Sequence, residues 1–168
     1  SGGDFDTDIP EAYIAENSLF YPTENGYKVG DYSELESVLT GDRVAMGNKV
    51  YTSADAAIAE GAVAAVKGSQ TVYASLQEAV TAAKSGNTVT LLADVTLDKT
   101  LVPAAKTIRF DLGGHTIYGT EGLEYLFDLS AREQSFDNGT IVAKGDAFRI
   151  RPAGLQLKRA TVTFGKDL

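Results

Sequence analysis

A short strand signature returns with a period in the low twenties along the C-terminal half of the chain. Segment 110–117 (Phe-Asp-Leu-Gly-Gly-His-Thr-Ile) resembles 136–141 (Phe-Asp-Asn-Gly-Thr-Ile), and 157–162 (Leu-Lys-Arg-Ala-Thr-Val) follows. Such strands, about three to six residues long, end at glycine or asparagine turns. Coils stacked about 4.8 Å apart would align their equivalent residues inside. The pattern therefore predicts a mainly β chain with the coils of a short parallel β-helix over 86–168.

An all-antiparallel sandwich is the alternative, because so few strands do not exclude one. A sandwich has hairpin turns about every 8–12 residues. Segments 88–92 and 107–112 carry the alternation of β-branched and apolar residues that is typical of strands. No helix is predicted after residue 85, which argues against an α/β fold.

A second repeat precedes these strands and has helical periodicity. Each of its three copies begins with a tyrosine: Tyr32, Tyr51 and Tyr73. Apolar residues follow at positions +3, +6 and +7, on one face of a helix. Ser75 with Glu78 has the spacing of a capping box, and Ser33 with Glu36 has the same spacing in the first copy.

A glycine turn precedes each of these helices. In 44–51 the pair Gly47-Asn48 predicts a two-residue hairpin, because both residues tolerate a positive φ. Segment 66–73 is the same unit with one extra residue, and 28–32 is a shortened version. Residues 27–85 are therefore predicted to form two or three small strand-turn-strand-helix modules.

The helix predicted over 75–84 has a role at the start of the coils. Its apolar face consists of Leu76, Ala79, Val80 and Ala83. The first coil of a β-helix exposes an open edge and an apolar interior, which an amphipathic helix can cover. Lys84 and Gly86 are expected to end the helix with a basic last turn and a glycine stop.

Composition and charge exclude several classes of function. The 168 residues include no cysteine and one histidine, so disulfides, thiol catalysis, thiolate metal sites and two-histidine metal sites are excluded. The net charge of −8 resides in residues 1–40, which hold nine acids and one base. The rest of the chain is neutral, and a general nucleic-acid binder is disfavoured because phosphates need a basic surface.

Residues 1–26 have no periodicity and are predicted to form an acidic N-terminal arm that docks in part through its aromatic residues. The run from Asp4 to Asp8 has the alternating acids that open a calcium loop. Ile9 stands where that loop needs glycine, and Ala15 stands at the closing acid position. A solvated acidic arm is the preferred interpretation, and the sequence predicts no metal and no cofactor.

Three segments together resemble the opening coils of right-handed parallel β-helix domains of the pectate-lyase-like superfamily: 73–92, 94–101 and 106–117. The resemblance covers about 73–165. It implies a right-handed parallel β-helix. It also implies a surface protein of gut-dwelling bacteria, of the kind described as putative adhesins. It also implies export, and the start Ser1-Gly-Gly-Asp looks like the residues after a lipoprotein cysteine.

Enzymes of this superfamily act on acidic polysaccharides, and the chain departs from their patterns. The resemblance implies that a hydrolase of this superfamily would need several aspartates clustered on adjacent strands. In this chain Asp111, Asp128 and Asp137 stand singly, far apart in the sequence. Arg149-Ile-Arg-Pro152 matches the basic strand of the lyases only superficially. Stacking would make Asp111 and Asp137 neighbours, but an aspartate before such turns more often holds backbone amides. His115 is interpreted in the same way, as a turn residue.

Two tyrosines and two arginines are the candidates for a ligand-binding surface. Tyr118 and Tyr125 lie in a segment that lengthens one coil, and their rings suit stacking on a sugar. The alternative is a loop whose Leu126 and Phe127 return to the core.

Arg149 and Arg151 belong to residues 144–168, which hold six bases and two acids. This local positive charge would attract an anionic glycan, and scattered solvated charge is the alternative.

The sequence thus predicts a non-catalytic domain, secreted or anchored at the cell surface, for adhesion or glycan binding. The alternatives are a degenerate or fragmentary relative of a polysaccharide lyase or hydrolase, and a purely architectural surface module. No apolar run reaches the ~20 residues of a membrane helix. An extracellular glycan is the expected partner, and a homo-oligomer through an uncapped C-terminal coil is a further expectation.

Overall fold

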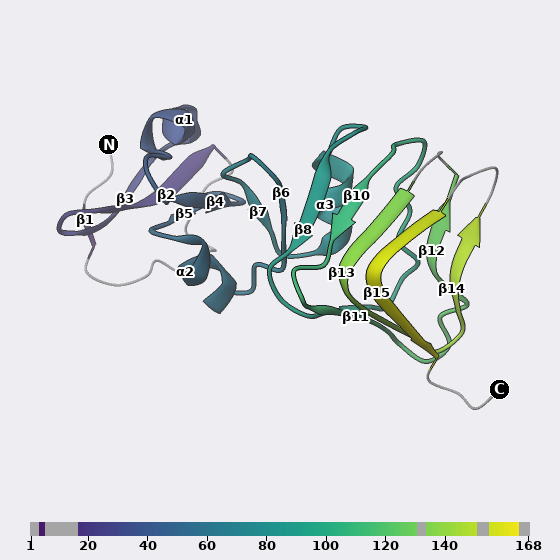
Figure 1. Ribbon diagram of the computed structural model, residues 1–168. Helices are drawn as coiled ribbons and strands as arrows, with labels where there is room; N and C mark the ends of the chain where they lie inside the picture. Colours follow the sequence, from purple (N-terminus) through teal and green to yellow (C-terminus); the bar gives the residue numbers. More distant parts are fainter. Residues whose placement is uncertain (1–3, 6–16, 131–133, 151–154, 165–168) are drawn as a thin grey trace. The chain divides into compact units, whose positions relative to one another are not determined.

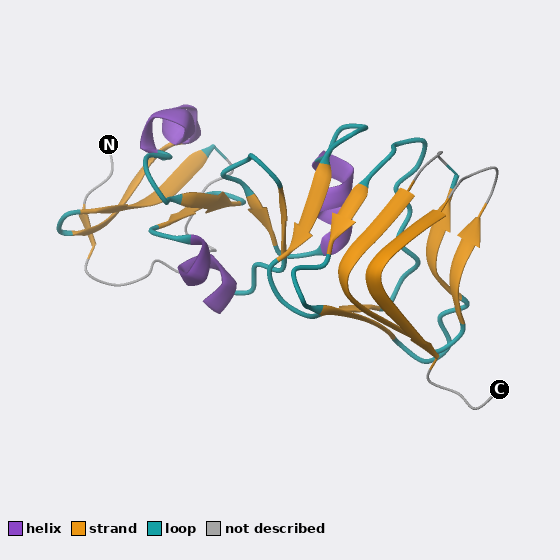
Figure 2. Ribbon diagram, in the orientation of Figure 1, coloured by secondary structure: helices purple, strands orange, loops and turns teal. Residues whose placement is uncertain are grey.

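The computed structural model describes residues 4–5, 17–130, 134–150 and 155–164. The described part is mainly β, with mixed parallel and antiparallel sheets and a few short helices (Figures 1 and 2). The chain divides into two compact units. The first contains residues 1–61 and 70–72, and the second contains residues 62–69 and 73–168.

A five-stranded sheet in the order β1-β3-β2-β5-β4 forms the first unit. Its strands are β1 (Asp4–Phe5), β2 (Ser18–Thr23), β3 (Gly26–Asp31), β4 (Val44–Met46) and β5 (Lys49–Tyr51). The hairpin predicted at Gly47-Asn48 is confirmed, since β4 and β5 pair antiparallel and Gly47 has a φ of 61°.

Strand β2 lies inside the segment expected to be an arm. It pairs antiparallel with β3, so the first hairpin turns at residues 24–25 and not within 28–32. Leu19 and Phe20 are fully buried, and four consecutive residues of β2 are buried. A strand covered on both faces has no alternation of apolar and polar residues, which is why the sequence showed no strand period here.

Three short helical segments follow these hairpins. Residues Tyr32–Glu34 form a 3-10 turn that continues into α1 (Leu35–Val38), and α2 spans Ala54–Ala59. The capping box predicted at Ser33 and Glu36 is wrong: Glu34 accepts a hydrogen bond from the Asp31 N–H (2.7 Å), and Asp31 accepts one from the Ser33 N–H (2.9 Å).

Helix α3 (Leu76–Ala82) begins as predicted, with Ser75 as N-cap. The Ser75 hydroxyl oxygen accepts from the Glu78 N–H and donates to the Glu78 carboxylate, both at 3.1 Å. All four residues of the expected apolar face are buried: Leu76, Ala79, Val80 and Ala83. They belong to the core of the second unit, as expected for a helix that covers its first strands.

The end of α3 differs from the prediction. The helix stops at Ala82, and Ala83 is already extended, so Lys84 lies outside it. Lys106 supplies the cation instead: its ammonium donates to the carbonyls of Val80, Thr81 and Ala83 at 2.7, 2.9 and 2.9 Å. A cation is favourable here because the last carbonyls of a helix have no partner within it.

The second unit contains an eight-stranded sheet and a two-stranded sheet. The strands are β6 (Ala64–Val66), β7 (Val72–Tyr73), β8 (Thr88–Leu91), β9 (Val95–Leu97), β10 (Arg109–Asp111), β11 (Thr116–Gly119), β12 (Tyr125–Leu129), β13 (Gln134–Ala143), β14 (Asp146–Ile150) and β15 (Leu155–Phe164). From β8 onward, all described pairings between these strands are parallel. An all-antiparallel sandwich is therefore wrong.

The parallel strands form three rows, and the chain visits the rows in the same order each time. The first row is β8, β10 and the start of β13; the second is β9, β11 and the end of β13; the third is β12 with β14. Strand β15 pairs along β13 in the first two rows. The alignments predicted from the repeat are confirmed: Phe110 pairs with Phe136, and Ile117, Ile141 and Val162 form one column.

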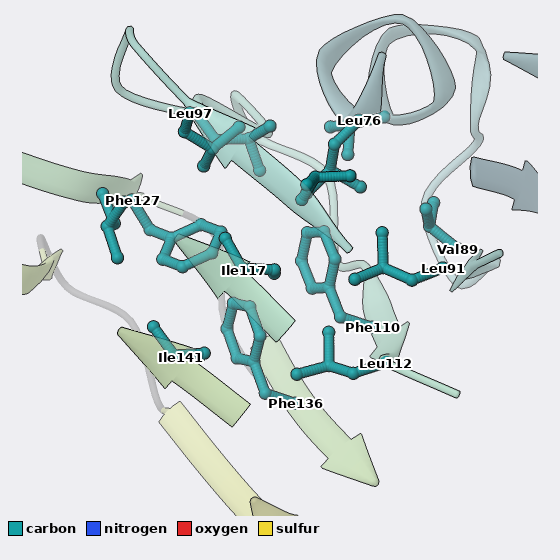
Figure 3. Close-up of a cluster of buried hydrophobic side chains, with 14 of the residues drawn as sticks. Leu76, Val89, Leu91, Leu97, Phe110, Leu112, Ile117, Phe127, Phe136 and Ile141 are labelled. Carbon is teal, nitrogen blue, oxygen red and sulfur yellow. The ribbon is translucent and has the colours of Figure 1, made fainter. Parts of the chain in front are cut away.

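Aromatic and aliphatic columns fill the space between the rows (Figure 3). The rings of Phe110 and Phe136 stack with centroids 4.6 Å apart and planes 4° apart. Phe127 meets Phe136 edge-on at 4.8 Å. Leu126 and Phe127 are 2% and 0% exposed, so the segment after Tyr125 returns to the core, as the alternative interpretation of that segment requires.

Candidate functional site

Two of the four predicted binding residues meet on the third row. Tyr125 and Arg149 lie on neighbouring strands β12 and β14, and the guanidinium carbon of Arg149 is 5.6 Å from the centre of the Tyr125 ring. This distance is within the range of a cation–π contact. The Thr100 hydroxyl donates to the Tyr125 carbonyl at 2.7 Å, which fixes the start of β12.

Tyr118 lies apart from this pair, on β11 of the second row. It is 41% exposed, and its ring has no aromatic neighbour within the described residues. Its partners in the sheet are Thr96 on β9 and Val142 on β13. The two tyrosines therefore lie on strands of different rows. Arg151 lies outside the described residues.

A cavity of about 550 Å³ borders the second unit's strand β9. Ser75 and Gln77 of α3 contribute to one wall, and residues 94–101 form much of the rest. Buried side chains such as Leu97 and Leu101 supply apolar surface, and Thr96, Asp98 and Lys99 supply polar surface. No pattern in the sequence indicated this cavity, because its walls come from segments about 20 residues apart.

Gln77 holds the outer part of this cavity in place. Its amide donates to the Val102 carbonyl at 3.4 Å, and its carbonyl oxygen accepts from the Val102 N–H at 3.2 Å. The side chain thereby fastens the loop after β9 to the helix.

The two aspartates considered as an acid pair occupy equivalent positions. Asp111 and Asp137 are register partners on β10 and β13. The Asp111 carboxylate accepts from the Gly113 N–H at 3.0 Å, which is the turn geometry expected for aspartate before glycines.

His115 lies in the turn before β11, where Asp94 approaches it. The His115 Nδ1 and the Asp94 carboxylate are 3.6 Å apart, with side chains 36% and 57% exposed. The same carboxylate accepts from the Thr116 N–H at 2.8 Å, so Asp94 fixes the start of β11.

The first unit has a cavity of its own, of about 480 Å³. Lys28, Asp31 and Glu34 are among its lining residues. Hydrogen bonds from the Ser33 side chain, and then from the Ser33 backbone, hold the pKa of Asp31 below its usual value. These carboxylates also cap the adjacent helical turn, so their geometry has a structural cause.

Within the described ranges, no group of three or more acidic or histidine side chains could hold a metal ion. The opening acids of the calcium-loop pattern fall mostly on residues outside these ranges. No helix in the described part of the chain is long and apolar enough to cross a membrane.

Comparisons with protein-family models, with curated proteins and with solved structures found no match to this chain.

Proposed function

We propose that the chain is a non-catalytic, secreted or surface-anchored domain that binds a glycan. In this proposal the second unit is a short right-handed parallel β-helix, related to pectate-lyase-like domains, and α3 covers its first coil. The three parallel rows visited in constant order support the β-helix. So do the aligned phenylalanines and isoleucines, because equivalent residues of successive coils stack inside such a fold.

The exposed ring of Tyr118 is the observation that carries the glycan-binding proposal. A tyrosine ring offers an apolar face for stacking on a sugar ring and a polar tip for a hydrogen bond. Tyr118 projects from a sheet whose neighbouring residues carry hydroxyl groups, such as Thr96 and Thr140. Tyr125 under Arg149 offers a second contact point, suited to an anionic group.

The geometry of the aspartates favours binding without catalysis. Glycoside hydrolysis needs two carboxyl groups that flank the scissile bond, one to donate a proton and one to act as base or nucleophile. The Asp111 carboxylate is instead held by the backbone of its own turn. A degenerate lyase or hydrolase is the alternative that the test below separates.

The test is a glycan array that includes neutral polysaccharides and uronic-acid polymers, with and without calcium. The same polymers are assayed for new reducing or unsaturated ends. Binding without new ends is the expected result. New ends would contradict the proposal and direct mutagenesis to Asp111 and Asp137. If the chain neither binds a glycan nor produces new ends, an architectural module is the better explanation.

A further inference from the structure

We infer that the glycan site of this domain is the exposed face of β9 and β11 together with the adjoining cavity, and that its ligand is a neutral saccharide. The inference rests on the proposed function and specifies where the glycan binds and which class it belongs to. Tyr118 provides the stacking surface, and Thr96 connects it to the cavity. Uronic-acid polymers, which the family resemblance would favour, are not the expected ligands.

Thr96 occupies the position that joins the ring to the cavity. It is the register partner of Tyr118, it is exposed, and it also lines the cavity of about 550 Å³. Side chains of register partners stand on the same face of a sheet, about 4.8 Å apart. A sugar ring stacked on Tyr118 would therefore have the Thr96 hydroxyl at its edge.

The backbone of Thr96 adds a donor and an acceptor. Strand β9 is the last strand of its sheet in the described part of the chain. The Leu97 carbonyl accepts from the Thr120 N–H on the β11 side, at 3.0 Å. Successive residues of a strand point their N–H and C=O groups to opposite sides, so those of Thr96 point away from β11, along the open edge. Sugar hydroxyls both donate and accept hydrogen bonds, and they match such a pair.

The cavity has the size and lining of a small-molecule site. Its volume lies within the range of about 300–1,000 Å³ that ligand pockets occupy. Its apolar surface comes from buried side chains such as Leu97 and Leu101, and its polar groups include Asp98 and Thr100. Gln77 fastens the loop that carries these groups to α3, so the site is held in place before a ligand arrives.

The charges around this site indicate the ligand class. Asp94 and Asp98 both line the cavity, with Lys99 as the base beside them. A uronic acid would bring its carboxylate toward these two carboxylates, whereas a neutral sugar would use them as hydrogen-bond acceptors. Arg149, which would favour a uronic acid, lies on the third row, beside Tyr125.

The experiment measures the affinity of the full chain for neutral tetrasaccharides of glucose, galactose, mannose and xylose, and for tetragalacturonate, by titration calorimetry. At least one neutral tetrasaccharide is expected to bind more tightly than tetragalacturonate. Tyr118→Ala is expected to weaken that binding at least about tenfold, and Thr96→Val about fivefold. Tyr32→Ala is the matched control, because Tyr32 is 42% exposed in the first unit, and it should bind like the wild type.

Other results would overturn the inference in distinguishable ways. If a neutral tetrasaccharide still binds both Tyr118→Ala and Thr96→Val with unchanged affinity, the site lies elsewhere and the proposed function stands. Binding of tetragalacturonate alone, lost in Arg149→Ala, would refute the ligand class and also leave the function standing. If neither these tetrasaccharides nor any glycan on the array binds, both the inference and the proposed function fail. Unchanged circular dichroism of the variants would show that a loss of binding is local.

Discussion

Gln134 is a residue whose importance only the structure reveals. It is fully buried, its carbonyl oxygen accepts from the Ile108 N–H at 2.9 Å, and its amide donates to the Lys106 carbonyl. The side chain thus satisfies two backbone groups in the segment just before β10. From sequence, a glutamine at the start of a strand looks like a surface residue, because glutamine is seldom buried.

Gln134→Leu should therefore lower the free energy of unfolding of the second unit by about 2–4 kcal/mol, because it leaves a buried N–H and a partly buried C=O without partners. Chemical denaturation monitored by circular dichroism measures this. Gln70→Leu is the matched control: the Gln70 side chain also bonds two backbone groups, the carbonyls of Gly41 and Arg43, but it is exposed and water can replace it. Equal losses from both substitutions would contradict the account.

Lys106 and Lys84 allow a direct comparison of the observed and the expected end of α3. Lys106→Met should destabilise the second unit by about 1–3 kcal/mol, because it removes a charged donor from three carbonyls at the end of α3. Lys84→Met should change the unfolding free energy by less than about 0.5 kcal/mol, since Lys84 is exposed and lies outside the helix. Thermal unfolding of both variants measures the difference. A larger effect at Lys84 would support the sequence-based expectation instead.

Asp31 gives the first unit a dependence on acid pH. Its pKa is lowered first by the Ser33 side chain, so the ionised carboxylate favours the folded state. That contribution is complete above the ordinary pKa of aspartate and is lost as the pH falls through the lowered folded value. An NMR titration should show the pKa of Asp31 rising in Ser33→Ala. An unchanged pKa in that variant would rule out the hydroxyl as the main cause.

At the scale of elements, the bend at the middle of β13 leaves no room for a side chain at Gly139. A Cβ at Gly139 would lie 2.2 Å from the Leu112 Cβ and 2.6 Å from the His115 carbonyl oxygen. The neighbouring Asn138 has a φ of 61°, so it carries the backbone conformation of the turn while Gly139 allows the close approach. The preceding copy of the repeat also has a glycine at this position, Gly113, whereas the following copy has Ala160.

Gly139→Ala is expected to destabilise the second unit by about 2–3 kcal/mol, because backbone and buried side chains must move to admit one methyl group. Asn138→Gly is the control, and it should be neutral or slightly stabilising because glycine adopts a positive φ at no steric cost. Urea denaturation of the two variants gives the comparison. Equal stability of Gly139→Ala and the wild type would contradict the close approach.

The sequence predicted elements best where a period was visible. The columns Phe110–Phe136 and Ile117–Ile141 and the apolar face of α3 followed from repeats of aligned residues. The prediction failed at β2, where burial on both faces of the strand removes the alternation of apolar and polar residues. It also misplaced the cation at the end of α3, because Lys106 is far from that helix in sequence and reaches it only through the fold.

At the scale of the whole molecule, the division into units and the binding surface were less predictable. The sequence boundary at residue 27 separated β2 from its partner β3, and residues 70–72 return to the first unit. Of the four candidate binding residues, Tyr125 and Arg149 meet, Tyr118 stands elsewhere, and Arg151 lies outside the described residues. Proximity within stacked rows depends on the register between strands, which the tyrosine spacing alone does not determine.

The most direct test of the neutral-glycan site on β9 and β11 is a map of backbone amide shifts. Nitrogen-15-labelled full chain is titrated with the neutral tetrasaccharides, and the amide signals of every assigned residue are followed. We expect shifts at Thr96, Asp98 and Tyr118, and none around Tyr32 in the first unit. Shifts confined to other residues, or no shift with any of the four saccharides, would contradict this expectation.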